Sequence, residues 1–85
     1  MYLEELFEKY AEWKILVHFL KYPQSELHVK EVARQLQVSP GTASKTLNKA
    51  AKDNLLNKRI IGNIHLYSLN KKDKRMRNLR RLVQP

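Results

Sequence analysis

Apolar residues recur at three- and four-residue steps along the first 20 positions, which is the spacing of one face of an amphipathic helix. The series is Leu3, Leu6, Phe7, Tyr10, Trp13, Leu16, Val17 and Leu20. Its first turns are acidic, which suits the positive end of the helix dipole, and Pro23 ends the helix near Tyr22. We therefore expect a helix over residues 2–21, and then a loop or a very short strand over residues 24–27.

A second helix and a third are predicted in close succession. The second spans Val29–Leu36, and Val38 follows in the turn; its apolar face is made of Val29, Val32, Ala33 and Leu36. The third begins at Ser39 and Pro40, because Ser39 can cap free backbone N–H groups and Pro40 suits the first helical position. It should run to about Asp53, with its inward positions at Ala43, Leu47, Ala50 and Ala51.

The chain then changes to two strand-forming runs, Leu56–Ile61 and Ile64–Leu69, on either side of Gly62-Asn63. This pair favours a two-residue hairpin turn, which would place Ile61 opposite Ile64, Lys58 opposite Tyr67, and Leu56 opposite Leu69. One face should pack on the core through Leu56, Ile60, Tyr67 and Leu69; the other carries Arg59, Ile61, Ile64 and Leu66. At the tip, Ile61 and Ile64 either pair across the strands or meet a partner.

A fourth helix is predicted over residues 71–83. Asn70 would be its N-cap, with Asp73 three residues later in an arrangement like a capping box. Its apolar stripe is narrow, and basic residues cover the rest of the helix; the stripe is Met76, Leu79, Leu82 and Val83.

Length and charge narrow the function. The 85 residues make one domain, with 17 Lys and Arg against 8 Asp and Glu. The net charge of residues 1–26 is −2 and that of residues 27–85 is +11, a field that attracts polyanions such as nucleic acids.

The sequence lacks the residues that several classes of function require. There is no cysteine for disulfides, for thiol chemistry or for the usual structural zinc site. We find no catalytic Ser/His/Asp set, no Gly-rich phosphate loop and no metal-ligand spacing, so we expect no enzyme, no cofactor and no metal. No apolar run approaches the roughly 20 residues that span a bilayer, and no secretory signal is present. We therefore expect a cytoplasmic protein that does not bind membranes.

The order of helix, helix, turn, helix, hairpin and helix, together with residues 29–50, resembles the winged helix-turn-helix superfamily. The family's small residue corresponds to Ala33, its turn hydrophobe to Val38, its capping serine to Ser39, and its inward pair to Ala43 and Leu47. Residues 54–59 resemble the entry to the wing, with Asn54 where glycine is usual, and residues 62–70 resemble its second strand. The resemblance is nearest to archaeal and bacterial MarR and ArsR regulators; the N-terminal winged-helix segment of some archaeal nucleotidyltransferases is also similar. It implies a mainly α fold with a small β-hairpin wing (α-α-α-β-β-α).

This resemblance implies a protein that binds double-stranded DNA. Its third helix would enter the major groove, where Ser44 and Asn48 can hydrogen-bond bases and Lys45 can reach a guanine or a phosphate. The wing would touch the backbone or the minor groove. The complete set of expected DNA-binding residues is Ser39, Pro40, Gly41, Thr42, Ser44, Lys45, Asn48, Lys49, Arg59 and Asn63. His65 is either a packing residue or a wing contact.

The terminal helices carry more apolar surface than a small monomer needs. We therefore expect a homodimer built from residues 2–21 and 71–83, with an interface of Leu3, Leu6, Phe7, Tyr10, Met76, Leu79 and Leu82. In the alternative, a monomer, the last helix packs antiparallel on the first. The predicted function is a sequence-specific transcriptional regulator; a protein-interaction module and a non-specific nucleic-acid-binding module are the alternatives. No small-molecule effector is indicated.

Overall fold

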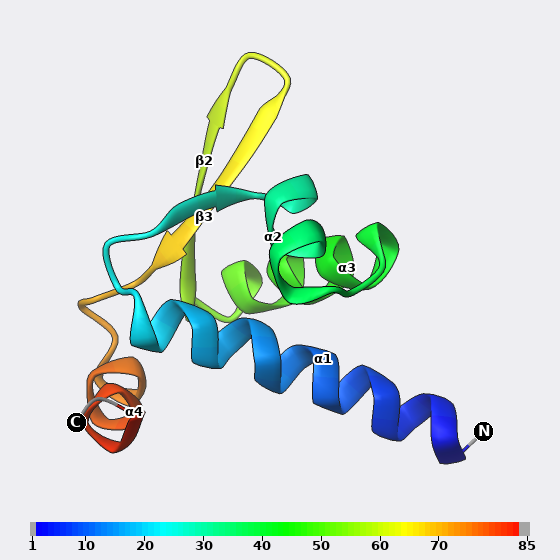
Figure 1. Ribbon diagram of the computed structural model, residues 1–85. Helices are drawn as coiled ribbons and strands as arrows, with labels where there is room; N and C mark the ends of the chain where they lie inside the picture. The colour runs from blue at the N-terminus through cyan, green and yellow to red at the C-terminus, as the bar shows by residue number, and fades with distance from the viewer. Residues whose placement is uncertain (1, 84–85) are drawn as a thin grey trace.

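The computed structural model describes residues 2–83, apart from the side chains of Tyr2 and Glu4. The elements follow the order α1 (Tyr2–Lys21), β1 (Glu26–His28), α2 (Val29–Leu36), α3 (Pro40–Lys52), β2 (Leu56–Ile61), β3 (Ile64–Leu69) and α4 (Lys74–Val83). The long helix α1 runs beneath α2, α3 and the sheet, and the β2–β3 hairpin projects away from the helices (Figure 1). This is a winged helix-turn-helix fold, as the sequence predicted.

The core lies where the inner face of α1 meets α3 and the sheet. Ile15 and Phe19 of α1 are fully buried, as are Leu47 of α3 and Val32 of α2. Ala43 and Ala50 are also buried in α3, and their small side chains let neighbouring elements approach closely. The helix-turn-helix therefore packs on the inner face of α1.

The three strands form an antiparallel sheet in the order β1-β3-β2. The predicted register is confirmed, since Ile61 lies opposite Ile64, Lys58 opposite Tyr67 and Leu56 opposite Leu69. Gly62 has a φ of 58°, which glycine adopts at no steric cost, and this permits the tight turn. The short strand β1 adds to the other edge of β3.

Ile60 and Met76 differ from the prediction. Ile60 was expected on the core face but is 59% exposed, because the hairpin extends beyond the helices that could cover its tip (Figure 1). Met76 was expected at a dimer interface but is 1% exposed within the single chain. It joins the core because α4 folds back beside the C-terminal end of α1 (Figure 1).

The start of α4 also differs. The helix begins at Lys74, and the carboxylate of Asp73 accepts the backbone N–H of Met76 at 3.2 Å. Asn70, the expected N-cap, instead donates its side-chain amide to the carbonyl oxygen of Asn54 at 2.8 Å. Asp73 takes the capping role because a carboxylate suits the positive end of the helix. Hydrogen bonding, first by Arg75 and also by Met76, holds the pKa of Asp73 below its usual range.

His28 is the N-cap of α2, a role for which the sequence analysis did not single it out. Its Nδ1 accepts the backbone N–H of Lys30 at 3.1 Å and that of Glu31 at 3.4 Å. The carboxylate of Glu31 accepts the backbone N–H of His28 in return, at 3.3 Å, which completes a capping box. The imidazole therefore replaces the oxygen that Ser, Asp or Asn usually supplies.

His28→Ala should lower the free energy of unfolding by about 1 kcal/mol, because the first turn of α2 loses its acceptor. His28→Ser restores an acceptor and should recover most of that loss. Equilibrium urea unfolding measures both, with His65→Ala on the exposed hairpin as the control. Equal stability of the Ala and Ser variants would contradict the capping role.

Candidate nucleic-acid interface

The turn between α2 and α3 is closed by backbone and side-chain hydrogen bonds. Gln37 adopts a left-handed conformation with φ 57°, and the N–H of Val38 donates to the carbonyl oxygen of Ala33 at 3.1 Å. Ser39 caps α3 by accepting the N–H of Thr42 at 3.2 Å, and Pro40 occupies the first turn. The predicted start of this helix is confirmed.

The C-terminal end of α3 leads into the hairpin through Asn54. This residue has a φ of 64°, so asparagine adopts the left-handed conformation that the sequence analysis expected at this position. The N–H of Leu55 then donates to the carbonyl oxygen of Ala50 at 2.9 Å. Helix α3 and the hairpin are thus joined by a short, hydrogen-bonded connection.

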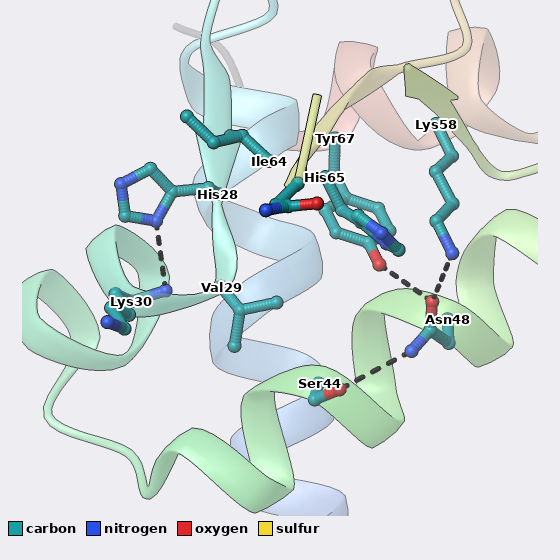
Figure 2. A pocket seen from close by; sticks show the side chains of 10 residues that line it. His28, Val29, Lys30, Ser44, Asn48, Lys58, Ile64, His65 and Tyr67 are labelled. Atoms are coloured by element: carbon teal, nitrogen blue, oxygen red, sulfur yellow. Dashed lines mark hydrogen bonds between the residues drawn. The ribbon is translucent and has the colours of Figure 1, made fainter. Parts of the chain in front are cut away.

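A groove of about 530 Å³ lies between α3 and the hairpin, beside the N-terminus of α2 (Figure 2). Ser44 and Asn48 reach it from α3, and Lys58 and Tyr67 from the hairpin (Figure 2). The remaining lining residues are His28, Val29, Lys30, Asn63, Ile64 and His65. Two lysines and no carboxylate line the groove, so its electrostatic character suits an anion.

Asn48 connects α3 to the hairpin. Its Oδ1 accepts the hydroxyl of Tyr67 at 2.6 Å and the ammonium of Lys58 at 3.1 Å, and its Nδ2 donates to Ser44 at 3.4 Å (Figure 2). Tyr67 is 1% exposed, so its hydroxyl depends on this acceptor. The network fixes how α3 lies against the hairpin.

The lysines of α3 lie close to acidic residues of α1. Lys45 is 3.6 Å from Glu8, and Lys49 is 3.8 Å from Glu12. Lys45, Lys49 and Glu8 are well exposed and Glu12 is partly exposed, and ion pairs of this kind contribute little to stability. The lysines therefore remain available to a stronger anionic partner.

Arg59, the predicted wing contact, lies on the other face of the hairpin. It donates two hydrogen bonds to Glu26 of β1, and these hold the pKa of Glu26 below its usual range. Because side chains alternate along a strand, Arg59 points away from the face that carries Lys58. Arg59 does not line the groove.

Most of the other predicted contact residues line one of two hollows in the surface. Ser44, Asn48 and Asn63 line the groove between α3 and the hairpin. Ser39 and Thr42 border a second hollow, of about 260 Å³, between α1 and the start of α3. Gly41 is exposed, and a Cβ built there would meet no atom within 4 Å.

Sequence reasoning missed Lys30, Lys58, Tyr67 and His28 as groove residues. Lys58 and Tyr67 could have been found as a pair on one face of the hairpin, because the predicted register places them opposite each other. His65, for which a packing role was considered, is exposed and lines the groove. Lys30 and His28 reach it only because β1 joins the sheet.

Among the side chains that the structure describes, no three His, Asp or Glu gather as a metal-binding group. No helix in this part of the chain has the length and apolar character to cross a membrane.

The fold is similar to that of a solved structure, reduced HlyU from Vibrio cholerae N16961, with a TM-score of 0.68 and 23% sequence identity. The match covers 86% of this chain and 72% of HlyU. No protein-family model and no curated protein sequence matches the chain. At this identity, the likeness to HlyU concerns the winged-helix fold.

The Asn48–Tyr67 contact can be tested by unfolding. Asn48→Ala should destabilise the protein by about 1–3 kcal/mol, because it leaves the buried hydroxyl of Tyr67 without an acceptor. Adding Tyr67→Phe removes that hydroxyl, so the double variant should be more stable than Asn48→Ala alone. Urea unfolding of the parent, both single variants and the double variant gives the coupling. Losses that simply add would show that the two side chains act independently.

Proposed function

We propose that this protein is a transcriptional regulator that binds double-stranded DNA as a homodimer, with α3 in the major groove and the hairpin along the backbone or minor groove. The observation that carries the proposal is the groove between α3 and the hairpin, which Lys30 and Lys58 line without any carboxylate. A phosphate backbone that follows this groove would bring the bases to the outer face of α3.

The exposed face of α3 has the chemistry for reading bases. An α-helix fits the major groove, where base edges present distinct donors and acceptors. Ser44 and Asn48 lie one turn apart, and Gly41 at the start of the helix leaves room for a phosphate near the helix N-terminus. The fold shared with HlyU and the resemblance of residues 29–50 to MarR and ArsR regulators support the same assignment.

The hydrogen bonds of Asn48 limit which base it can read. Pairing of asparagine with adenine needs its carbonyl oxygen to accept from N6. Both lone pairs of that oxygen are already used by Tyr67 and Lys58. Asn48 would therefore act as a donor to guanine O6 or N7, thymine O4 or adenine N7, without the two-bond pairing that distinguishes adenine.

A protein-interaction module is the second candidate. The exposed apolar tip of the hairpin favours it, because Ile60, Ile61 and Ile64 are each more than half exposed. Contiguous apolar residues at the surface often mark protein contacts. Such a module would not need the cationic groove.

The proposal predicts different effects for Ser44→Ala and Lys30→Gln. After selection of a binding site from random duplexes, Ser44→Ala should weaken binding to that site more than to random DNA, by about 1–3 kcal/mol. Lys30→Gln should weaken both and reduce the salt slope by about 1, since it releases one fewer counterion. Fluorescence anisotropy over a salt series measures these effects, with Lys21→Gln on α1 as the control.

An affinity that does not change with salt, or a selection that enriches no sequence, would contradict the proposal. In the first case the charge does not serve nucleic-acid binding. In the second the protein binds DNA without reading its sequence, which is the non-specific alternative.

The acidic residues of α1 should lower DNA affinity, because they compete with phosphate for Lys45 and Lys49. Glu8→Gln and Glu12→Gln should each tighten duplex binding by up to about fivefold at low salt, the worth of an exposed ion pair. The gain should shrink above about 0.15 M salt, where screening acts within roughly 8 Å.

The matched control is Glu5→Gln, which removes one carboxylate from α1 at a residue for which the described side chains offer no ion pair. If all three variants changed affinity equally, only net charge would matter. If Glu8→Gln weakened binding, the proposed competition would be wrong.

A further inference from the structure

Helix α4 and the two residues before its cap form a strongly basic segment. Residues 71–83 hold seven Lys and Arg against one acidic residue, Asp73, so the net charge of the segment is +6. The carboxylate of Asp73 already caps α4 and accepts a hydrogen bond from Arg75 at 2.9 Å. It is therefore not available to neutralise the rest of the helix.

Three of these cations lie on one face of α4. Lys74, Arg77 and Arg81 follow each other at steps of three and four residues, the spacing of neighbours on a helix surface. All three are exposed, whereas Met76 faces the core and is 1% exposed. We call Lys74, Arg77 and Arg81 the α4 basic face. At 1.5 Å per residue, this face is about 10 Å long.

The α4 basic face is not neutralised by its own neighbours. Among the described side chains, no carboxylate lies within ion-pair distance of its three cations. By contrast, Lys45 and Lys49 of α3 lie near glutamates of α1, and Arg59 of the hairpin binds Glu26. The cations of α4 therefore keep their full attraction for an anionic partner.

Contacts with the core and with the end of α3 hold α4 in place. Arg75 donates to the carbonyl oxygen of Asp53, the C-cap of α3, at 2.9 Å. Asn70 donates to the carbonyl oxygen of Asn54 at 2.8 Å, and Met76 packs in the core. The α4 basic face therefore has a fixed position relative to α3, and binding does not require the helix to become ordered.

The α4 basic face lies away from the groove between α3 and the hairpin. Figure 1 shows α4 beside the C-terminal end of α1, while the hairpin projects in the opposite direction. No residue of α4 lines the groove. Leu79 and Leu82, which the sequence analysis expects at a dimer interface, lie on another side of the helix. A duplex in the groove, and a dimer through those leucines, would both leave the face open.

We propose that the α4 basic face binds the phosphate backbone of a second DNA duplex, without reading its sequence, while the groove holds the first. The protein then bridges two segments of double-stranded DNA. The existence of this second site goes beyond the proposed function. The choice of DNA and the bridging rest on the proposed function, because a protein held on DNA by its groove meets other segments of that DNA at high local concentration.

The composition of α4 favours a duplex backbone over other anionic partners. Arg and Lys are common partners of phosphate oxygens, and such contacts carry no sequence information. Residues 71–83 contain no aromatic residue, whereas single-stranded nucleic acids stack their bases on aromatic side chains. Lysine is depleted at protein interfaces. A membrane surface would need the apolar side of the helix, where Met76 is already buried in the core.

The second site is tested in the background Lys30→Gln/Lys58→Gln, which removes both lysines from the groove. In this background, Arg77→Gln/Arg81→Gln should weaken binding to a random-sequence duplex by about tenfold and reduce the salt slope by about 2, because two fewer phosphates are neutralised. Fluorescence anisotropy over a salt series measures both effects. Glutamine is a good helix former, so the variant should keep the helical circular dichroism of the parent.

The matched control is Lys9→Gln/Lys21→Gln, which removes the same charge from exposed positions of α1. Lys21 lines a hollow to which α4 contributes no residue. The control should change affinity by less than about twofold, because these lysines do not meet the second duplex. Equal losses in the two double variants would show that only net charge matters, and would overturn the proposal.

Three other results would also overturn the second site. The first is a Lys30→Gln/Lys58→Gln protein that no longer binds the random duplex. The second is tighter binding of an RNA duplex of the same sequence. The third is displacement of the DNA by an acidic peptide of equal charge, which would assign the face to a protein partner.

Bridging is tested with beads that carry the duplex obtained by selection and a free, labelled duplex of random sequence. With every selected site occupied, the parent should retain the free duplex. Arg77→Gln/Arg81→Gln should bind the selected duplex within about twofold of the parent but retain about tenfold less of the free one.

Retention that the α4 variant does not reduce would show that two grooves of a dimer hold the two duplexes, and would overturn the assignment to α4. A parent that retains no free duplex would overturn bridging. If selection enriches no sequence, the proposed function fails, but the anisotropy measurements still decide whether α4 binds a duplex.

Discussion

The hydrogen bond from Tyr67 to Asn48 is the contact on which the arrangement of this winged helix depends. The ring of Tyr67 is buried in the core, its backbone pairs with both neighbouring strands, and its hydroxyl reaches α3. One side chain thereby positions the sheet and α3 relative to each other. It also determines the shape of the groove between them, and through Asn48 it determines which hydrogen-bonding atoms α3 can still offer.

Helix α3 has basic side chains on one side and acidic side chains on the other. On the hairpin side, Lys30 and Lys58 line a groove that has no carboxylate. On the other side, Glu8 and Glu12 of α1 approach the lysines of α3. The net charge of +9 therefore describes the chain poorly, because Glu8 and Glu12 partly neutralise Lys45 and Lys49, whereas Lys30 and Lys58 face no carboxylate in the groove. An anion should prefer the hairpin side.

Helix α1 carries two apolar faces. Its inner face closes the core of a small domain, and its outer face repeats the spacing of a helix pair. Small domains bury a modest share of their surface on folding, so a second interface is a common source of additional stability. Both faces belong to the same 20 residues. The apolar positions of this helix therefore spread around much of its circumference.

The sequence by itself determined the fold and most of the element boundaries, because these depend on local spacing, capping and turn chemistry. Ser39 and Pro40, the left-handed Asn54 and the hairpin register were all predictable in this way. Capping by His28 and by Asp73 was not, since several nearby residues could have served. Only the tertiary structure decided that Met76 is buried, that Ile60 is not, and that Asn48 is held by Tyr67. Those outcomes depend on how far each element reaches past its neighbours, a distance that the order of residues along the chain does not contain.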